Sequence, residues 1–299
     1  MFIIKNKKIF IGISIALVVL SLLSLSIFGL KIGIDFKGGA LTEVVYTDIR
    51  PEQADLYKSV ETLNLGSILI QPTGDKGYLV KSSILNDVEH KNLLKVLSAD
   101  NKNALTEVSF NSIGPSVGRE LTRKAIVAII LVSLAIIFFI AFAFRKVSKP
   151  VSSWRYGFIA IVSLLHDVLI PVGLFVILSH YYGAEVDTLF LVAILTVLGL
   201  SVSDTIVIFD RIRENLKNDL SHKTNFHEIV GKSLEQSYVR SICTSLTVIL
   251  VLLALFFFGP VSTKYFALML TAGMFFGTYS SIFLASPLLV WVAEKQLNK

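Results

Sequence analysis

Cysteine and histidine are scarce in this chain, which has one cysteine, Cys243, and five histidines among 299 residues. A single cysteine excludes a disulfide framework within the chain, and no H-E-x-x-H run or Cys/His cluster indicates a metal site. The phosphate-binding pattern G-x-x-x-x-G-K-[ST] and the G-x-S-x-G nucleophile elbow are also missing. The sequence therefore carries no signature of a nucleotide hydrolase or other hydrolytic enzyme, and we expect no cofactor.

Charged residues are also few. They make up 17% of the chain and hydrophobic residues 54%, against about 25% and about 45–50% in soluble domains. The net charge of +6 would suit a nucleic-acid-binding protein, but the basic residues lie beside apolar runs, where they act as a topology signal. We therefore expect a membrane protein that binds no nucleic acid.

Six apolar stretches are long enough to cross a bilayer, which takes about 20 residues. The first resembles a signal peptide, but it is longer than a signal core and no A-x-A-type site follows it, which favours a retained anchor. The six stretches are residues 9–30, 124–144, 156–179, 188–210, 240–259 and 264–292.

Lysine and arginine concentrate in the N-terminus, the tail and every second connection between these stretches. Positive charge marks the cytoplasmic side of membrane proteins, so both termini are predicted to be cytoplasmic and residues 31–123 extracytoplasmic. The basic residues on the predicted cytoplasmic side are Lys5, Lys7, Lys8, Arg145, Lys146, Lys149, Arg155, Arg211, Arg213, Lys217, Lys223, Lys232, Lys295 and Lys299.

The segment 31–123 has the pattern of a small folded domain. Strands are predicted over residues 40–47, 67–71, 78–82 and 105–111, and helices over 51–63 and 86–97. Pro51 opens the first helix, residues 72–77 form a turn, and Asn86 with Glu89 makes a capping box. The order β-α-β-β-α-β is ferredoxin-like. No catalytic cluster occurs here, and His90 is expected at the surface, so the domain is interpreted as a binding or moving part.

The predicted fold class is thus an α-helical polytopic membrane protein with six transmembrane helices. A small α+β ferredoxin-like domain lies between helices 1 and 2. The predicted divisions are 1–30 for the N-terminus and first helix, 31–123 for the outer domain, and 124–299 for a five-helix bundle.

One aspartate, Asp204, lies inside the fourth apolar stretch, about six residues from its cytoplasmic end. Ionisable groups at such depth are costly and are functional candidates by default. Ser201 and Thr205 share its helix face by i, i+3, i+4 spacing. The site could bind and release protons, or Asp204 could be a structural residue hydrogen-bonded to a neighbouring helix.

Two further charged places occur in the spans. Arg240 opens the fifth stretch, where it either marks topology by reaching the interface or pairs with Asp204. His166 and Asp167 lie near the middle of the third stretch and must face protein or water. They either join a proton relay or hydrogen-bond to neighbouring helices.

Small residues recur every four positions in the last stretch. Such a stripe is typical of close helix packing. Its members are Gly273, Gly277, Ser281 and Ala285.

Five motifs, in order along the chain, resemble the SecF family, in the SecD/SecF branch of the resistance-nodulation-division transporters. They are G-I-D-F-K-G-G (Gly33–Gly39), I-G-P-S-V-G-R-E-L (Ile113–Leu121), L-L-H-D-V (Leu164–Val168), S-D-T-I-V-I-F-D-R-I-R-E-N (Ser203–Asn215) and R-S-I-C-T-S-L-T (Arg240–Thr247).

This resemblance implies a subunit of the Sec protein-export machinery in the bacterial inner (plasma) membrane. It would work with SecD, beside the SecYEG channel and with YajC and YidC, to move unfolded preprotein at a late stage with the proton motive force. Alternatives are a small-molecule or lipid exporter subunit of the same superfamily, or a non-pumping scaffold for SecD.

The resemblance also implies roles for particular residues. Proton transport falls to Asp204 and Arg240, with sodium as the alternative coupling ion. Leu200 and Ser203 depart from the Tyr and Asn usual beside that aspartate, which reduces the polar surroundings of Asp204. The candidate relay comprises His166, Asp167, Ser201 and Thr205, and the extracytoplasmic motif comprises Asp35, Phe36, Gly38 and Gly39.

Overall fold

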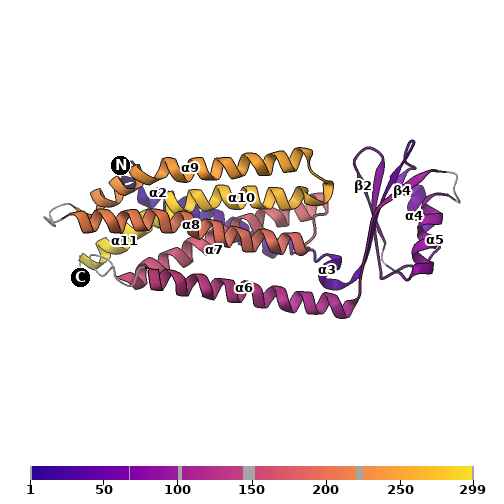
Figure 1. Cartoon of the computed structure of the whole chain (residues 1–299), viewed down its shortest axis with the longest axis horizontal. Helices are drawn as coiled ribbons and strands as arrows, with labels where there is room; N and C mark the ends of the chain where they lie inside the picture. Colours follow the sequence, from indigo (N-terminus) through magenta and orange to yellow (C-terminus); the bar gives the residue numbers. More distant parts are fainter. Residues whose placement is uncertain (1, 67, 100–102, 144–151, 220–224, 298–299) are drawn as a thin grey trace. The chain divides into compact units, whose positions relative to one another are not determined.

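The computed structural model describes residues 2–66, 68–99, 103–143, 152–219 and 225–297. The chain divides into two compact units (Figure 1): a helical unit of Met1–Lys31 with Ala128–Lys299, and a second unit of Ile32–Val127. We describe each unit by itself.

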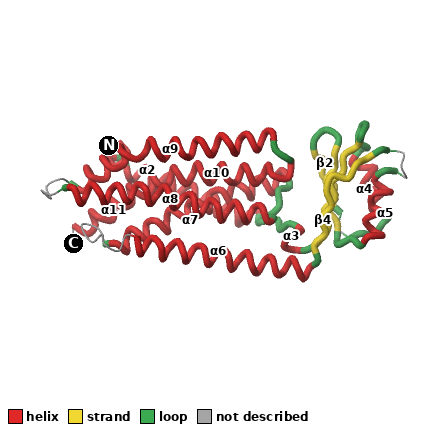
Figure 2. Tube along the Cα trace, in the orientation of Figure 1, coloured by secondary structure: helices red, strands yellow, loops and turns green. Residues whose placement is uncertain are grey.

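Six helices in the described ranges are long and apolar enough to cross a membrane, which confirms the predicted fold class (Figure 2). Two short elements, α1 (Phe2–Lys5) and η1 (Val261–Thr263), accompany them. The spans are α2 (Lys7–Phe28), α6 (Pro115–Ala143), α7 (Ser153–Tyr182), α8 (Thr188–Asn218), α9 (Phe226–Phe258) and a sixth made of α10 (Lys264–Ser280), η2 (Ser281–Ala285) and α11 (Ser286–Leu297).

Helices α8 and α9 extend well beyond the apolar stretches that predicted them. Polar pairs support the extensions: Arg211 Nη1 lies 2.6 Å from Glu214 Oε2 on α8. Asn215 Nδ2 donates to Ser233 Oγ of α9 at 2.8 Å. Hydropathy locates the apolar part of a helix and not its end, because a helix held by such pairs continues into water.

The sixth span is not the continuous α-helix expected over residues 264–292. It is interrupted by one π-helical segment, Ser281–Ala285. Ser286 Oγ donates to the carbonyl oxygen of Ser281 at 3.1 Å, five residues earlier. Such π turns are frequent at functional sites, and no hydropathy pattern predicts them.

Helix α7 and the sixth span form the centre of the helical unit. The most apolar windows of these two spans are 56% and 61% buried, against 6% for α6. Helices α7 and α10 therefore pack against other helices on most of their surface, whereas most of the surface of α6 is exposed.

The predicted small-residue stripe is confirmed as the contact between α10 and α8. A β-carbon at Gly273 would collide with the side chain of Val197, and one at Gly277 would lie 3.2 Å from Ser201 Cβ. One turn further, Ser281 Oγ lies 2.9 Å from Thr205 Oγ1. The absence of side chains at the two glycines lets the helices approach closely.

The second unit has the predicted β-α-β-β-α-β order. Its four strands form one antiparallel sheet in the order β2-β3-β1-β4. The elements are β1 (Gly39–Tyr46), α4 (Gln53–Glu61), β2 (Leu69–Thr73), β3 (Gly77–Ser82), α5 (Asp87–Leu97) and β4 (Leu105–Ile113).

The structure confirms the capping box predicted in this unit but places two prolines differently from the prediction. The capping box of Asn86 and Glu89 is confirmed. Pro51, expected in the first turn of a helix, instead precedes the N-cap Glu52 of α4. Pro72, expected in a turn, lies in β2 opposite Tyr78, since an edge strand tolerates proline. The predicted strand 67–71 begins at Ser67, which is outside the described residues.

His90 is not the solvated surface residue that was expected. Its ring stacks on Phe110 with 3.7 Å between centroids. Its Nε2 lies 3.0 Å from Glu107 Oε1. The histidine therefore joins α5 to β4.

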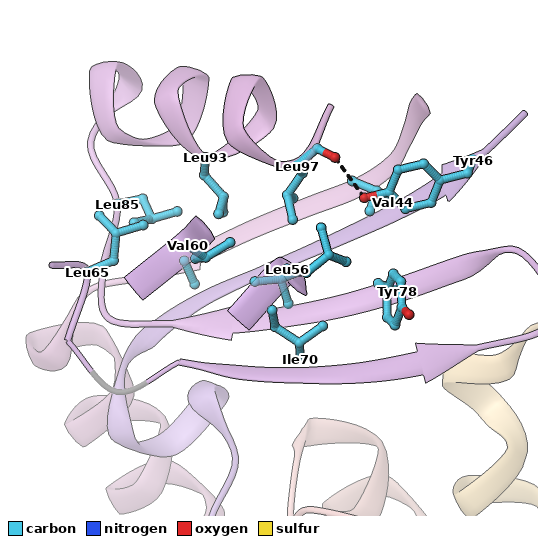
Figure 3. Close-up of a cluster of buried hydrophobic side chains, with 12 residues drawn as sticks. Val44, Tyr46, Leu56, Val60, Leu65, Ile70, Tyr78, Leu85, Leu93 and Leu97 are labelled. Atoms are coloured by element: carbon cyan, nitrogen blue, oxygen red, sulfur yellow. Dashed lines mark hydrogen bonds between the residues drawn. The ribbon is translucent and has the colours of Figure 1, made fainter. Parts of the chain in front are cut away.

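The core of this unit lies between the sheet and its two helices (Figure 3). Tyr46 is 1% exposed, and its hydroxyl donates to the carbonyl oxygen of Leu97 at 2.9 Å. Burial, with a smaller effect of Tyr78, raises the pKa of Tyr46 to about 12. The buried apolar side chains are Ala40, Val44, Tyr46, Leu56, Val60, Leu65, Ile70, Tyr78, Val80, Leu85, Leu93 and Leu97.

Replacing Tyr46 with phenylalanine tests this hydrogen bond. The substitution leaves a buried carbonyl without its donor, which costs about 1–2 kcal/mol. We expect amide hydrogen exchange in β1 and α5 of the full chain in detergent to speed up by about tenfold.

The stability that the Tyr46 hydrogen bond gives this unit should decrease at alkaline pH. Because the folded pKa of Tyr46 is raised, its hydrogen bond contributes fully below the ordinary tyrosine pKa of 10.0 and is lost as pH rises towards about 12. Tyr46→Phe should lack this alkaline component of exchange. Equal exchange profiles of the two proteins from neutral to alkaline pH would contradict the assignment.

The close approach of α8 and α10 can be tested with Gly277→Leu. A large side chain opposite Ser201 overpacks the contact, at a cost of about 1–3 kcal/mol. Thermal unfolding in detergent should therefore begin several degrees lower. The matched control is Gly199→Leu, on α8, where a β-carbon meets no atom within 4 Å; equal destabilisation by both changes would count against this packing.

Candidate functional site

The carboxylate of Asp167 on α7 lies at the centre of a buried polar cluster. Asp167 is 0% exposed. Its Oδ1 lies 2.8 Å from His166 Nδ1. Its Oδ2 accepts hydrogen bonds from Ser280 Oγ of α10, at 2.7 Å, and from Ser201 Oγ of α8. One side chain thus joins three helices.

His166 is also buried, with 2% of its surface exposed. Its ring stacks over Tyr279 of α10, with 6.1 Å between centroids. Nδ1 faces Asp167, whereas Nε2 has no hydrogen-bond partner among the described residues.

Asp204 on α8 lies in a second, less buried polar cluster. Its Oδ2 accepts hydrogen bonds from Thr278 Oγ1 of α10 at 3.0 Å and from Ser245 Oγ of α9 at 3.4 Å. The hydroxyls of Ser245 and Thr278 also contact each other. Unlike Asp167, Asp204 is only half-buried.

Ser201, Asp204 and Thr205, which were predicted to share one helix face, contact different partners in the structure. Ser201 hydrogen-bonds to Asp167 of α7, and Thr205 Oγ1 meets Ser281 Oγ at the π turn. Asp204 is directed instead to α9 and α10. Residues three or four apart are neighbours on a helix, but each side chain follows the partner that the packing offers it.

The sequence interpretation missed three hydroxyl donors: Ser245, Thr278 and Ser280. A signal was present, since Thr278, Ser280 and Ser281 stand close together in an apolar span. Polar residues in a span hydrogen-bond across helices, but spacing alone did not indicate which carboxylate each would serve.

Arg240 on α9 is exposed and makes no ion pair among the described residues. The hypothesis of a direct pair with Asp204 is therefore not supported by a contact in this state of the molecule. Arg240 lines a groove of about 350 Å³ between α8 and α9. The other lining residues are Ile206, Val207, Asp210, Arg211, Glu214, Gln236 and Ser237.

The outward surfaces of α8 and α9 carry polar residues within the spans. Ser203, Thr244 and Thr247 are exposed. Thr244 Oγ1 and Thr247 Oγ1 each donate to the carbonyl oxygen four residues earlier, at 2.9 and 2.8 Å. Hydroxyls in lipid commonly satisfy themselves in this way or hydrogen-bond to another helix.

The outer motif forms a short helix, α3 (Ile34–Lys37), with Asp35 in its first turn. Gly38 follows with a positive φ of 85°, and a β-carbon on it would lie 3.0 Å from Pro115. A β-carbon at Gly118 would lie 2.8 Å from the carbonyl oxygen of Phe36. The first two motifs of the chain therefore pack against each other.

Comparison with known proteins gives the family. Residues 93–295 match the family model for protein export membrane protein SecD/SecF, C-terminal. The protein translocase subunit SecF of Thermobaculum terrenum is 42% identical, over 96% of this chain and 92% of that protein. SecF of Anaerolinea thermophila is 38% identical, over 99% of this chain and 96% of that protein.

The solved structure of SecDF, a translocon-associated membrane protein from Thermus thermophilus, has the same fold, with a TM-score of 0.82 and 30% identity. The match covers 98% of this chain but 38% of SecDF. The chain thus spans well under half of that longer protein. Together these matches show that the chain belongs to the SecD/SecF family of protein-export membrane proteins, as a SecF-type translocase subunit.

Proposed function

We propose that this chain works with a SecD-type partner to draw unfolded preproteins across the bacterial inner membrane, using proton flow rather than nucleotide hydrolysis. The observation that carries the proposal is Asp204, a carboxylate within a span that is held by two hydroxyls and is still partly accessible. Ionisable residues at this depth characteristically mark ion paths.

The geometry of Asp204 suits proton binding and release. Both of its hydrogen bonds go to Oδ2, so Oδ1 has no hydrogen-bond partner among the described residues. An oxygen that is not committed to a donor can accept a proton without breaking a contact. The hydroxyls of Ser245 and Thr278 can continue to donate to Oδ2 whether or not Oδ1 carries a proton.

Arg240 provides the second element of the proposed path. It lies on the groove between α8 and α9, whose wall includes Ile206 and Val207, two and three residues beyond Asp204. A guanidinium keeps its charge throughout, so a change of charge on Asp204 changes the attraction between them. Such a change can bias the packing of two helices.

Beyond this pair, His166, Asp167, Ser201 and Thr205 either extend the path as a relay or hold neighbouring helices together by hydrogen bonds. Ser201 contacts Asp167 directly, whereas Thr205 is directed to Ser281. Proton is the coupling ion in this proposal; sodium is the alternative, because a carboxylate with hydroxyls can bind either ion.

Two observations support a SecD-type partner: the family to which the chain belongs, and the exposed polar residues on α8 and α9. Curated relatives include SecDF of Bacillus subtilis, of which this chain matches 38%. Ser203 and Arg240 are exposed, and Arg240 makes no ion pair among the described residues, so both would be poorly placed against lipid. A second bundle covering α8 and α9 would shelter them. SecYEG, YajC and YidC are further proposed partners, from the family resemblance.

The proposed topology has cytoplasmic termini and an extracytoplasmic unit between α2 and α6. Charge alternation supports it: Arg155, Arg211, Arg213 and Lys217 lie at one set of helix ends. Of the other basic residues of those connections, Lys232 lies near the start of α9. Arg145, Lys146, Lys149 and Lys223, and the terminal Lys299, lie outside the described residues.

Replacing Asp204 with asparagine tests the coupling role. The change keeps the size and the acceptor oxygen but removes titration. In vesicles holding the complete complex, we expect proton conductance and export after the ATP-driven stage to fall at least tenfold. Asp219→Asn, at the C-terminal end of the same helix and not among the residues that line the groove of Arg240, is the control and should stay within about twofold of wild type. Wild-type conductance in Asp204→Asn would refute proton coupling through this residue.

The topology can be tested by cysteine labelling in a Cys243→Ser background. Asp75→Cys, in the exposed turn between β2 and β3, should react with a membrane-impermeant maleimide on intact cells whose outer membrane is made permeable. Lys217→Cys, exposed near the end of α8, should react only after the inner membrane is opened. The reverse pattern would invert the orientation.

A further inference from the structure

Asp167 connects α8 and α10, two of the three helices that build the Asp204 site. We propose that Asp167 is a positioning residue: its carboxylate fixes α8 against α10 and so keeps Thr278 within hydrogen-bonding distance of Asp204. This inference rests on the proposed proton-binding role of Asp204 and assigns to Asp167 a task other than relay.

The argument begins with one oxygen atom. Oδ2 of Asp167 accepts from Ser201 on α8 and from Ser280 on α10. Ser201 precedes Asp204 by three residues, or about 4.5 Å along a helix axis. Ser280 follows Thr278 by two residues. Because a helix moves as a rigid rod over one turn, a slip of α8 along α10 would stretch both the Asp167 contacts and the Asp204–Thr278 bond.

Other contacts also restrain α8 and α10 where both hydrogen-bond to Asp167. Gly277 brings the backbones of α8 and α10 together at Ser201. Ser280 Oγ and Ser281 Oγ each lie 3.0 Å from the carbonyl oxygen of Gly277. Both oxygens of Asp167 are hydrogen-bonded, and a buried carboxylate with its acceptors occupied holds its donors in a specific arrangement.

Asp167 is badly placed to act as a proton station. It is 0% exposed, and its donors Ser201 and Ser280 are 5% and 0% exposed. Both of its oxygens are already hydrogen-bonded, in contrast to Asp204. Among the described residues, the titratable group in contact with Asp167 is His166 on α7. Tyr279 of α10 stacks on His166. Asp204 of α8 is close enough to interact electrostatically with Asp167, and Arg240 of α9 interacts in the same way with Asp204.

The decisive comparison is between Asp167→Asn and Asp167→Leu in the complete complex. Asparagine keeps an acceptor oxygen for Ser201 and Ser280, and its amide can donate to His166 Nδ1, but it cannot release a proton. Positioning predicts that Asp167→Asn keeps conductance within about twofold, with the same midpoint on its pH profile. Asp167→Leu should lose at least tenfold and shift that midpoint. Loss of conductance in Asp167→Asn equal to that of Asp204→Asn would overturn the proposal in favour of a relay.

A milder variant covers the case in which Asp167→Leu does not fold. Ser280→Ala removes one donor and no charge, and should shift the pH midpoint in the same direction as Asp167→Leu. Thr271→Ala is the control, since among the described residues this hydroxyl of α10 donates to its own helix, at the carbonyl oxygen of Ala267. An unchanged midpoint in Ser280→Ala would also overturn the proposal.

A spectroscopic readout separates positioning from transport. Infrared difference spectra across the titration should contain a carboxyl band that is missing in Asp204→Asn. In Ser280→Ala that band should move to higher frequency, because the hydrogen bond from Thr278 is weakened, and in Asp167→Asn it should stay in place. If Asp204→Asn conducts normally, the proposed function fails; if it does not, but the band ignores Ser280→Ala, only the positioning role fails.

Discussion

The helical unit depends on one buried carboxylate that is shared among three helices. Asp167 of α7 accepts from α8 and α10 with the same oxygen and faces His166 with the other. An unpaired charge at this depth would be severely destabilising, so these donors have to be in place whenever the bundle is assembled. The requirement specifies how far α8 and α10 are apart and in what register. The glycine stripe then allows the close contact that the serine hydroxyls need.

Asp167 and Asp204 differ in burial and in how many of their carboxylate oxygens are hydrogen-bonded. Asp167 is fully enclosed and its oxygens are occupied, whereas Asp204 is half-buried and uses one oxygen for both of its bonds. The bundle thus holds one enclosed carboxylate that joins three helices and, on the adjacent helix, one carboxylate that is still partly accessible. The π segment begins at Ser281, which contacts Thr205, directly after Ser280, which donates to Asp167.

The second unit follows a different principle, since its strength comes from an apolar core between one sheet face and two helices. Its first and last segments also meet: the outer glycine motif packs against the chain that leads into α6, around Gly38 and Gly118. Side chains at either glycine would intrude on backbone atoms, so the beginning and the end of the unit are held together tightly.

The sequence by itself determined the six spans, the β-α-β-β-α-β order and the capping box at Asn86, because hydropathy and capping act over one or two turns of chain. It also singled out Asp204, His166 and Asp167, because charge within an apolar run is visible without a structure. Only the tertiary structure decided which hydroxyls serve which carboxylate, since Ser280 lies 113 positions from Asp167 and Thr278 lies 74 from Asp204. The physical reason is that a buried polar group is satisfied by whatever donor the packing brings to it, and helix packing is not encoded in any local pattern.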